Sequence, residues 1–362
     1  MSAQGHCQVE VDQVFVMPHP LAPRSGHSFH AIDDGERSHL VAFGGYDGSR
    51  RRKDILHLPN YPLPGRREVG TEPASLAWRR CVAPAEVAGR AGHVAVQVGP
   101  GEIFLFGGYQ SDRENLKESM LLRCLPTGDG ALTFEFHPIK DEPVVKPDTA
   151  DPLERRWAAG WRVGRPDDQG FQVMVHGGWN QAGKSDSLLM FSSKSNVWQY
   201  LRPLGDLPSG RRWHNALPLD EEGRTTLMYG GYDGGALADL FLFDAEATKW
   251  IKGRSSGTVP PARCRSGLLR LSSKEILCFG GYGSSSQPGA SKPLSDAYIL
   301  HTDDMKWAPL PSKGLFLLNR AGMSVSPFTI PGSNSFGGVC FGGFDGSQDL
   351  SQDVFHIFPS SS

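Results

Sequence analysis

Pairs of adjacent glycines recur along the 362-residue chain, each at the end of a short apolar run. The first glycines of these pairs stand 50 to 70 residues apart, at Gly44, Gly107, Gly177, Gly230, Gly280 and Gly342. The apolar runs, such as Leu40 to Phe43 and Ile276 to Phe279, are too short for helices and are typical of buried strands. A repeat of this length buries its apolar faces against neighbouring copies of itself. The pattern therefore predicts six similar β units.

Three further residue types recur in a fixed order around each glycine pair. An arginine lies 17 to 22 residues before the pair, at Arg24, Arg90, Arg156, Arg211, Arg263 and Arg320. An acidic residue after the pair opens a second apolar run, at Asp54, Glu118, Asp186, Asp239, Asp296 and Asp353. A tryptophan follows in four units, at Trp78, Trp198, Trp250 and Trp307, and unit 2 has Phe134 or Phe136 there. This order predicts four antiparallel strands per unit: A after the arginine, B before the glycines, C after the acidic residue and D around the tryptophan.

Arginine, glycine pair, acidic residue and tryptophan in this order resemble the Kelch repeat, whose units of roughly 50 residues each form one propeller blade. The resemblance covers nearly the whole chain and implies an all-β fold, a six-bladed Kelch β-propeller forming one domain over residues 1–362. The expected blades span approximately residues 24–82, 90–139, 156–202, 211–252, 263–309 and 320–358. Unit 3 departs from the pattern, because Arg156-Trp157-Ala158-Ala159 replaces the Arg-x-x-His of units 1, 2 and 4.

The two ends of the chain complement each other. The last unit ends at Ser362 without room for strand D, while an alternating run from Val9 to Val16 precedes the first unit. An open ring would leave a strand edge exposed, which favours aggregation. We therefore expect residues 1–23 to contain a closing strand that completes the sixth blade.

Antiparallel connectivity brings the D-to-A and B-to-C connections of all blades to one face of the ring, called here the mouth. An aromatic residue follows every glycine pair and belongs to this face: Tyr46, Tyr109, Trp179, Tyr232, Tyr282 and Phe344. Tyrosine, tryptophan and arginine are enriched in binding hot spots. These aromatics, together with Arg24, Arg90, Arg211, Arg263 and Arg320, form the predicted partner-binding site. The resemblance to Kelch proteins implies that the mouth receives a partner peptide.

A structural role for the same residues is the competing hypothesis. Each repeated arginine lies within reach of the acidic residue that opens strand C, so the arginines could serve only to hold the ring together, and the tyrosines could be packing residues. His27, His93 and His214 recur with the blades and are expected to pack. The basic run Arg50-Arg51-Arg52-Lys53 is either a solvated loop or a contact for an acidic, extended partner segment.

Charge and motifs narrow the function. Lysine and arginine number 37 against 39 acidic residues, a net charge of −2 that provides no field for nucleic acid or an anionic membrane. Six cysteines without a CxxC spacing predict free thiols. No stretch of 18 apolar residues and no secretory signal occur, so we expect a soluble cytoplasmic protein, with the nucleus left open, and we expect it to be a monomer. No catalytic, metal or cofactor motif occurs. We therefore expect a non-enzymatic protein–protein interaction module without cofactor or metal. The alternative is a small-molecule, sugar-type isomerase or ligand-binding propeller, because sialic-acid mutarotation is known on a Kelch propeller.

Overall fold

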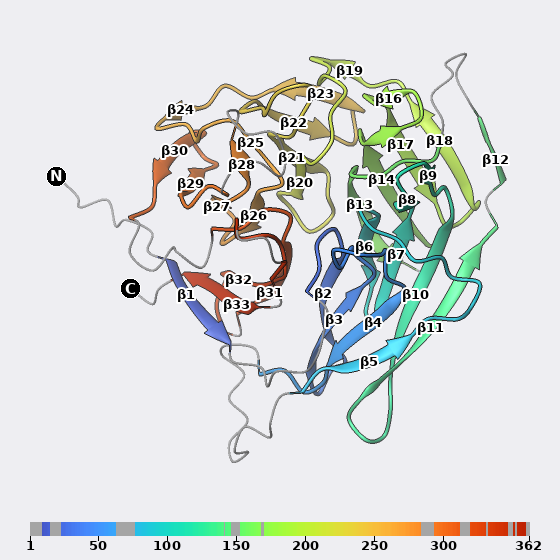
Figure 1. Cartoon of the computed structure of the whole chain (residues 1–362). Helices are drawn as coiled ribbons and strands as arrows, with labels where there is room; N and C mark the ends of the chain where they lie inside the picture. The colour runs from blue at the N-terminus through green and yellow to red at the C-terminus, as the bar shows by residue number, and fades with distance from the viewer. Residues whose placement is uncertain are drawn as a thin grey trace.

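Six antiparallel sheets stand in a ring around a central axis (Figure 1). The computed structural model describes residues 9–14, 23–62, 77–140, 142–145, 153–167, 170–283, 293–311, 319–330, 332–346, 350–351 and 353–359. These residues contain no helix, and hence none long and apolar enough to cross a membrane. The predicted six-bladed β-propeller is confirmed.

Strands A to D follow one another from the axis to the rim of each blade. Blade 1 contains β2 (Ser28–Asp33), β3 (Ser38–Phe43), β4 (Asp54–Leu58) and β5 (Arg79–Val82). Blade 2 contains β6 (Val94–Gly99), β7 (Glu102–Phe106), β10 (Ser119–Pro126) and β11 (Leu132–Ile139). Blade 3 contains β13 (Ala159–Asp167), β14 (Gly170–His176), β17 (Leu188–Ser192) and β18 (Val197–Leu201).

Blades 4 to 6 repeat this order. Blade 4 contains β20 (Asn215–Pro218), β21 (Thr225–Tyr229), β22 (Leu240–Asp244) and β23 (Lys249–Lys252). Blade 5 contains β26 (Gly267–Arg270), β27 (Glu275–Phe279), β29 (Ala297–His301) and β30 (Lys306–Pro309). Blade 6 contains β31 (Ser324–Thr329), β32 (Phe336–Phe341) and β33 (Val354–Pro359).

The N-terminal strand completes blade 6, as the sequence predicts. Strand β1 (Val9–Val14) pairs antiparallel with β33, with Val9 opposite Pro359 and Val14 opposite Val354. Figure 1 shows this blue strand beside the red one. Phe15 and Val16, the last residues of the expected strand, lie outside the described residues.

Short strands that the repeat did not predict extend several blades. Parallel strands β12 (Glu142–Val145), β19 (Leu204–Gly205) and β24 (Ser256–Gly257) pair with β18, β23 and β30 at the rims of blades 3, 4 and 5. At the mouth, β8 (Tyr109–Ser111) pairs with β9 (Glu114–Asn115), β15 (Trp179–Asn180) with β16 (Gly183–Lys184), and β25 (Arg263–Cys264) with β28 (Tyr282–Gly283).

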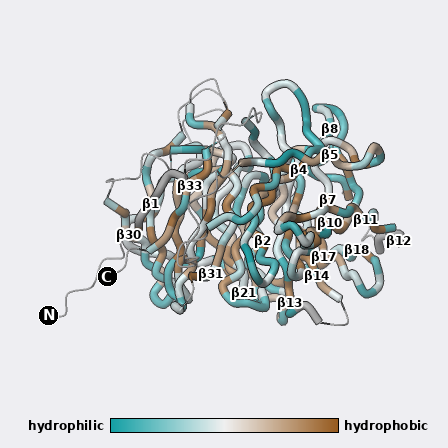
Figure 2. Tube along the Cα trace, turned by 90° about the horizontal axis from the view of Figure 1, so that it is seen from below, coloured by the Kyte–Doolittle hydropathy of each residue, from teal (hydrophilic) through white to brown (hydrophobic). Residues whose placement is uncertain are grey.

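The hydrophobic core is divided among the junctions between blades. Six clusters of buried side chains each combine residues of two adjacent blades, including blades 6 and 1. In β3, Leu40 and Ala42 pack toward blade 6, whereas Val41 and Phe43 pack toward blade 2. Both faces of such a strand are buried, which explains its unbroken apolar sequence. In side view, hydrophobic strands fill the middle and hydrophilic loops lie above and below (Figure 2).

The glycine pairs join neighbouring blades. The second glycine of each pair donates its N–H to the carbonyl of the arginine of the next blade, as from Gly45 to Arg90 at 2.8 Å. The bond from Gly343 to Arg24, at 3.1 Å, closes the ring. A Cβ on Gly342 would lie 2.6 Å from the Arg24 carbonyl oxygen, and its φ is +71°. Glycine is therefore required both by the close approach and by the backbone.

Candidate functional site

The arginines that open strand A are buried and bind other strands of their own blade, and they are called staples here. Arg24, Arg90, Arg211, Arg263 and Arg320 are at most 7% exposed. Arg211 donates to the Gly230 carbonyl at 3.0 Å and pairs with both oxygens of Asp239 at 2.6 and 2.8 Å. Their side chains are thus occupied within the ring, which favours the structural hypothesis over contact with a partner.

In blade 3 the staple is Arg155, so the prediction of Arg156 is wrong by one residue. Arg155 is 1% exposed and donates to the Gly177 carbonyl at 3.1 Å. It also donates to the hydroxyls of Ser185 and Ser187, which stand where other blades use a carboxylate. Arg156 therefore occupies the position directly after the staple.

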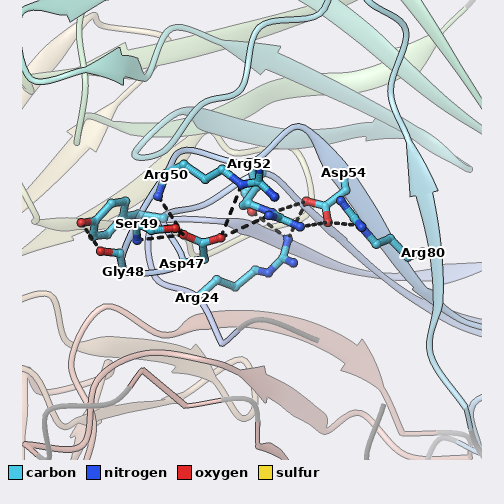
Figure 3. A network of polar contacts seen from close by, with 10 residues as sticks. Arg24, Asp47, Gly48, Ser49, Arg50, Arg52, Asp54 and Arg80 are labelled. Atoms are coloured by element: carbon cyan, nitrogen blue, oxygen red, sulfur yellow. Dashed lines mark hydrogen bonds and ion pairs between the residues drawn. The ribbon is translucent and has the colours of Figure 1, made fainter. Parts of the chain in front are cut away.

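The basic run of blade 1 is held by its own carboxylates (Figure 3). Arg52 donates to Asp47 at 3.2 Å and to Asp54 at 3.1 Å. Asp54 also accepts from Arg24 at 3.4 Å and from Arg80 at 2.6 Å. Burial alone would raise the pKa of Asp54, but the hydrogen bond from Arg52 and the charge of Arg24 lower it to about 2. Arg52 of the basic run is therefore paired with two carboxylates and does not contribute a free cation to a partner-binding patch.

The other members of the run are partly accessible. Arg51 pairs with Asp112, and its guanidinium carbon lies 5.0 Å from the ring centre of Tyr46 and 4.7 Å from that of Tyr109. Arg50 is 70% exposed, with Nε 4.0 Å from Asp47. Lys53 donates to the Pro84 carbonyl at 2.9 Å. Each basic side chain of the run thus already has a partner within the protein.

The repeated histidines pack between blades, as expected. Gly342, Gly44 and Gly177 lie against His27, His93 and His214 of the following blade. The His27 ring meets that of Phe341 edge-on at 5.0 Å. Burial, with the charge of Arg24, lowers the pKa of His27 to about 3. These imidazoles are therefore neutral and structural at physiological pH.

The two residues after each staple surround the axis at the mouth. They are small in blades 1, 2 and 6: Ser25-Gly26, Ala91-Gly92 and Ala321-Gly322. They are large in blades 3, 4 and 5: Arg156-Trp157, Arg212-Trp213 and Cys264-Arg265. The first residue of each pair bridges to the aromatic after the glycine pair of the same blade, as Arg212 does to Tyr232. The mouth is therefore bulky on one half only.

A chain of backbone hydrogen bonds links the second residues of these pairs around the axis. Gly92 donates to Gly26 at 2.7 Å, and the series continues through blades 3, 4 and 5 to the bond from Gly322 to Arg265 at 3.0 Å. All six residues have positive φ, including the non-glycine residues Trp157 at 62°, Trp213 at 59° and Arg265 at 55°. Such strain at large residues is characteristic of functional sites.

Aromatic rings and guanidinium groups alternate on the bulky half. Ring centres lie 5.5 Å apart for Tyr109 and Trp157, 6.0 Å for Trp157 and Trp213, and 5.8 Å for Trp213 and Tyr232. The guanidinium carbons of Arg212 and Arg265 lie 3.9 and 4.0 Å from the centre of Trp213. Arg212 also lies over Trp179 at 4.5 Å. Trp213 is thus the centre of a cation–π cluster.

Arg212 and Arg265 have no carboxylate partner among the described residues, and neither side chain makes a hydrogen bond there. Burial lowers the pKa of both, and the charges of Arg265 and Arg156 lower that of Arg212 further. Burial also lowers the pKa of Arg156, which is within the field of Asp112. Partly buried cations that repel one another are stabilised by a nearby negative charge.

Sequence reasoning identified part of this cluster. Of the six predicted aromatics, Tyr46, Trp179, Tyr232 and Phe344 are partly exposed, whereas Tyr109 and Tyr282 are 8% and 3% exposed. Trp157, Trp213, Arg212 and Arg265 were missed. A signal was present, because Arg-Arg-Trp occurs at 155–157 and again at 211–213. Aligning these two triplets would have placed the staple at Arg155 and a second arginine at the mouth.

Below the mouth, strands β2, β6, β13, β20, β26 and β31 line a central channel of about 650 Å³. The indole of Trp157 lies against Gly26 and Gly92, where a Cβ would approach it to 2.7 Å. This ring therefore fills the space above the glycine half of the mouth. The described residues contain no group of three or more His, Cys, Asp or Glu side chains arranged to hold a metal ion.

Comparison with known proteins identifies one family model and several relatives that this chain resembles. Residues 168–359 match the family model of the KLHDC2/KLHL20/DRC7 Kelch-repeats domain. Kelch domain-containing protein 2 of Bos taurus is 25% identical over 300 residues, which cover 79% of this chain and 68% of that protein. Kelch domain-containing protein 3 of Homo sapiens is 31% identical over 135 residues, 34% of this chain and 33% of that protein. Kelch repeat-containing protein kel-10 of Caenorhabditis elegans is 24% identical over 179 residues, 48% of this chain and 28% of that protein.

Proposed function

Because the chain belongs to the Kelch-repeat family, we propose that it is a non-catalytic interaction module that binds an acidic, extended segment of a partner protein at the mouth. Kelch propellers are typically protein-interaction modules. The observation that carries the proposal is the pair of stacked guanidinium groups, Arg212 and Arg265, without a carboxylate partner among the described residues. The bulky half of the mouth, rather than the basic run of blade 1, provides the main contacts.

The residue types support binding rather than packing alone. Guanidinium groups stacked on an aromatic face keep their N–H edges free for in-plane hydrogen bonds to carboxylates. The rings of Trp157, Trp179 and Tyr232 supply rigid apolar area around them, as in interface hot spots. The isomerase alternative gains no support from the family match.

Peptide selection on the purified propeller tests this proposal. Displayed random peptides should be enriched in aspartate and glutamate. The enriched peptide should bind at least 10-fold more weakly to Arg212→Gln and to Arg265→Gln than to the wild type, and this loss of affinity corresponds to about 1.4 kcal/mol or more. Arg224→Gln is the matched control, because Arg224 is exposed and pairs with Glu222 at the start of β21. Selected peptides that lack acidic residues, or that bind the two variants undiminished, would refute the proposal.

A further inference from the structure

The mouth contains more hydrogen-bond donors than one carboxylate can satisfy. The Nε atoms of Arg156, Arg212 and Arg265 and the indole Nε1 of Trp213 are buried and have no acceptor in the part of the chain that the structure describes. None of these groups can accept a hydrogen bond in return, because guanidinium and indole nitrogens only donate. These groups therefore favour a ligand that presents several acceptors to them.

The charge at the mouth also exceeds that of one carboxylate. Arg212 and Arg265 both lie within 4.0 Å of the centre of Trp213, and no carboxylate of the described residues forms an ion pair with either. A single aspartate or glutamate would balance one of these two charges. A phosphomonoester carries −1.5 to −2 charges at pH 7 and offers three acceptor oxygens.

We propose that the group bound between Arg212, Arg265 and Arg156 is a phosphomonoester on a side chain of the partner segment. This proposal rests on the proposed function and adds the identity of the anchoring group. Three phosphate oxygens accept from the edges of the stacked guanidinium groups, and such charge-assisted bonds are about twice as strong as neutral ones. The carbon side of the ester packs against the rings of Trp157 and Trp213, which keep water from the bonds.

An oriented peptide library tests the proposal. Its members are amidated peptides whose central residue is phosphoserine, phosphothreonine, phosphotyrosine, glutamate or serine, flanked by degenerate positions. The phosphorylated centres should be retained at least 10-fold more strongly than glutamate, and comparison among the three identifies the preferred ester. Matched peptides with a free carboxyl terminus and central serine report whether a terminal carboxylate binds instead.

A solution titration measures the same preference without a library. Phenyl phosphate should change the tryptophan fluorescence, because three indoles line the cluster, and acetate at equal concentration should change it at least 10-fold less. The phosphate second pKa is about 6, so the affinity for phenyl phosphate should fall between pH 7.5 and 5.5. A carboxylate ligand would keep its affinity over this range.

Substitutions inside and outside the mouth test whether the assigned residues bind the phosphate. Arg212→Lys keeps the charge but loses the planar fork, and it should weaken phosphopeptide binding several-fold, less than Arg212→Gln. Arg224→Gln should bind as the wild type does.

Glutamate or free carboxyl termini retained as strongly as phosphorylated centres would overturn this inference but leave the proposed function standing. Failure of all acidic centres to bind would overturn both, and phosphopeptide binding unchanged in the double variant Arg212→Gln/Arg265→Gln would overturn the assigned site.

Discussion

Arginine occupies two consecutive positions in blades 3 and 4, and its surroundings differ between them. Arg211 is 1% exposed and bonded to Asp239, whereas Arg212, one residue later, is partly exposed and stacked on Trp213. Because successive residues of an extended chain point to opposite sides, one arginine enters the ring and the next faces the mouth. The same residue type therefore serves stability at one position and is available for binding at the next.

The buried staples should dominate the stability of the propeller. We expect Arg263→Met to lower the free energy of unfolding by about 3 kcal/mol or more, because it leaves Asp296 and the Gly280 carbonyl without their donor. Urea unfolding followed by tryptophan fluorescence measures this loss. The exposed Arg224→Met should change the free energy of unfolding by about 0.5 kcal/mol or less. Equal stability of the two variants would show that the staple contributes little.

At the level of strands and turns, the glycine pairs set the distance between blades. Gly342→Ala should destabilise the ring roughly 2 kcal/mol more than Gly35→Ala, because only the first substitution brings a Cβ against a backbone oxygen. Both glycines have positive φ, at +71° and +96°, so the backbone strain is common to the two variants. Thermal unfolding of the pair tests the expectation. Similar melting temperatures would mean that blade 1 moves aside without cost.

The closing strand should matter to the whole ring although it belongs to one blade. Deleting residues 1–16 removes β1 and leaves β33 with an unpaired edge. The melting temperature should fall by more than about 2 °C, which corresponds to roughly 1 kcal/mol in a chain of this size. A smaller shift in differential scanning calorimetry would show that β1 is dispensable for closure.

The sequence best predicts the strands whose marker residues recur from blade to blade. Strands A to D follow from residues present in nearly every blade, and the closing strand follows from the alternating run before the first blade. Strands β12, β19 and β24 have no such repeated marker, because they pair through the backbone of two to four residues. The left-handed backbone at Trp157 and Trp213 was equally hidden, since large residues seldom adopt it. The cation–π cluster around Trp213 depends on these exceptions, and the two Arg-Arg-Trp triplets are the only sequence signal for it noted above.

For the molecule as a whole, buried neutral histidines should make stability sensitive to acid. Burial lowers the pKa of His27, His57 and His176 from 6.5 to about 3, and of His30 and His356 to about 4. Between these values and 6.5 the unfolded chain binds more protons than the folded one. The free energy of unfolding therefore has the full contribution of these neutral histidines above pH 6.5, and it decreases as the pH falls toward 4.

Melting temperatures from pH 7.5 to 4.5 should show this loss, at about 1.4 kcal/mol per pH unit for each histidine. His27→Phe keeps a ring against Phe341 but removes one such group, so its stability should depend on pH less steeply by about one proton. An unchanged slope in this variant would assign the acid sensitivity to other groups.

The pairing of β1 with β33 also determines how late β1 can join its sheet while the protein is being synthesised. Val9 and Pro359 are neighbours in the folded sheet but lie at opposite ends of the chain. At about 5–20 residues per second, a ribosome needs roughly 20 to 70 seconds to pass from one to the other. Throughout that time β1 has no sheet to join, and the apolar face of blade 1 that packs against blade 6 stays uncovered. A strand made before all six blades thus pairs only after the last of them is made.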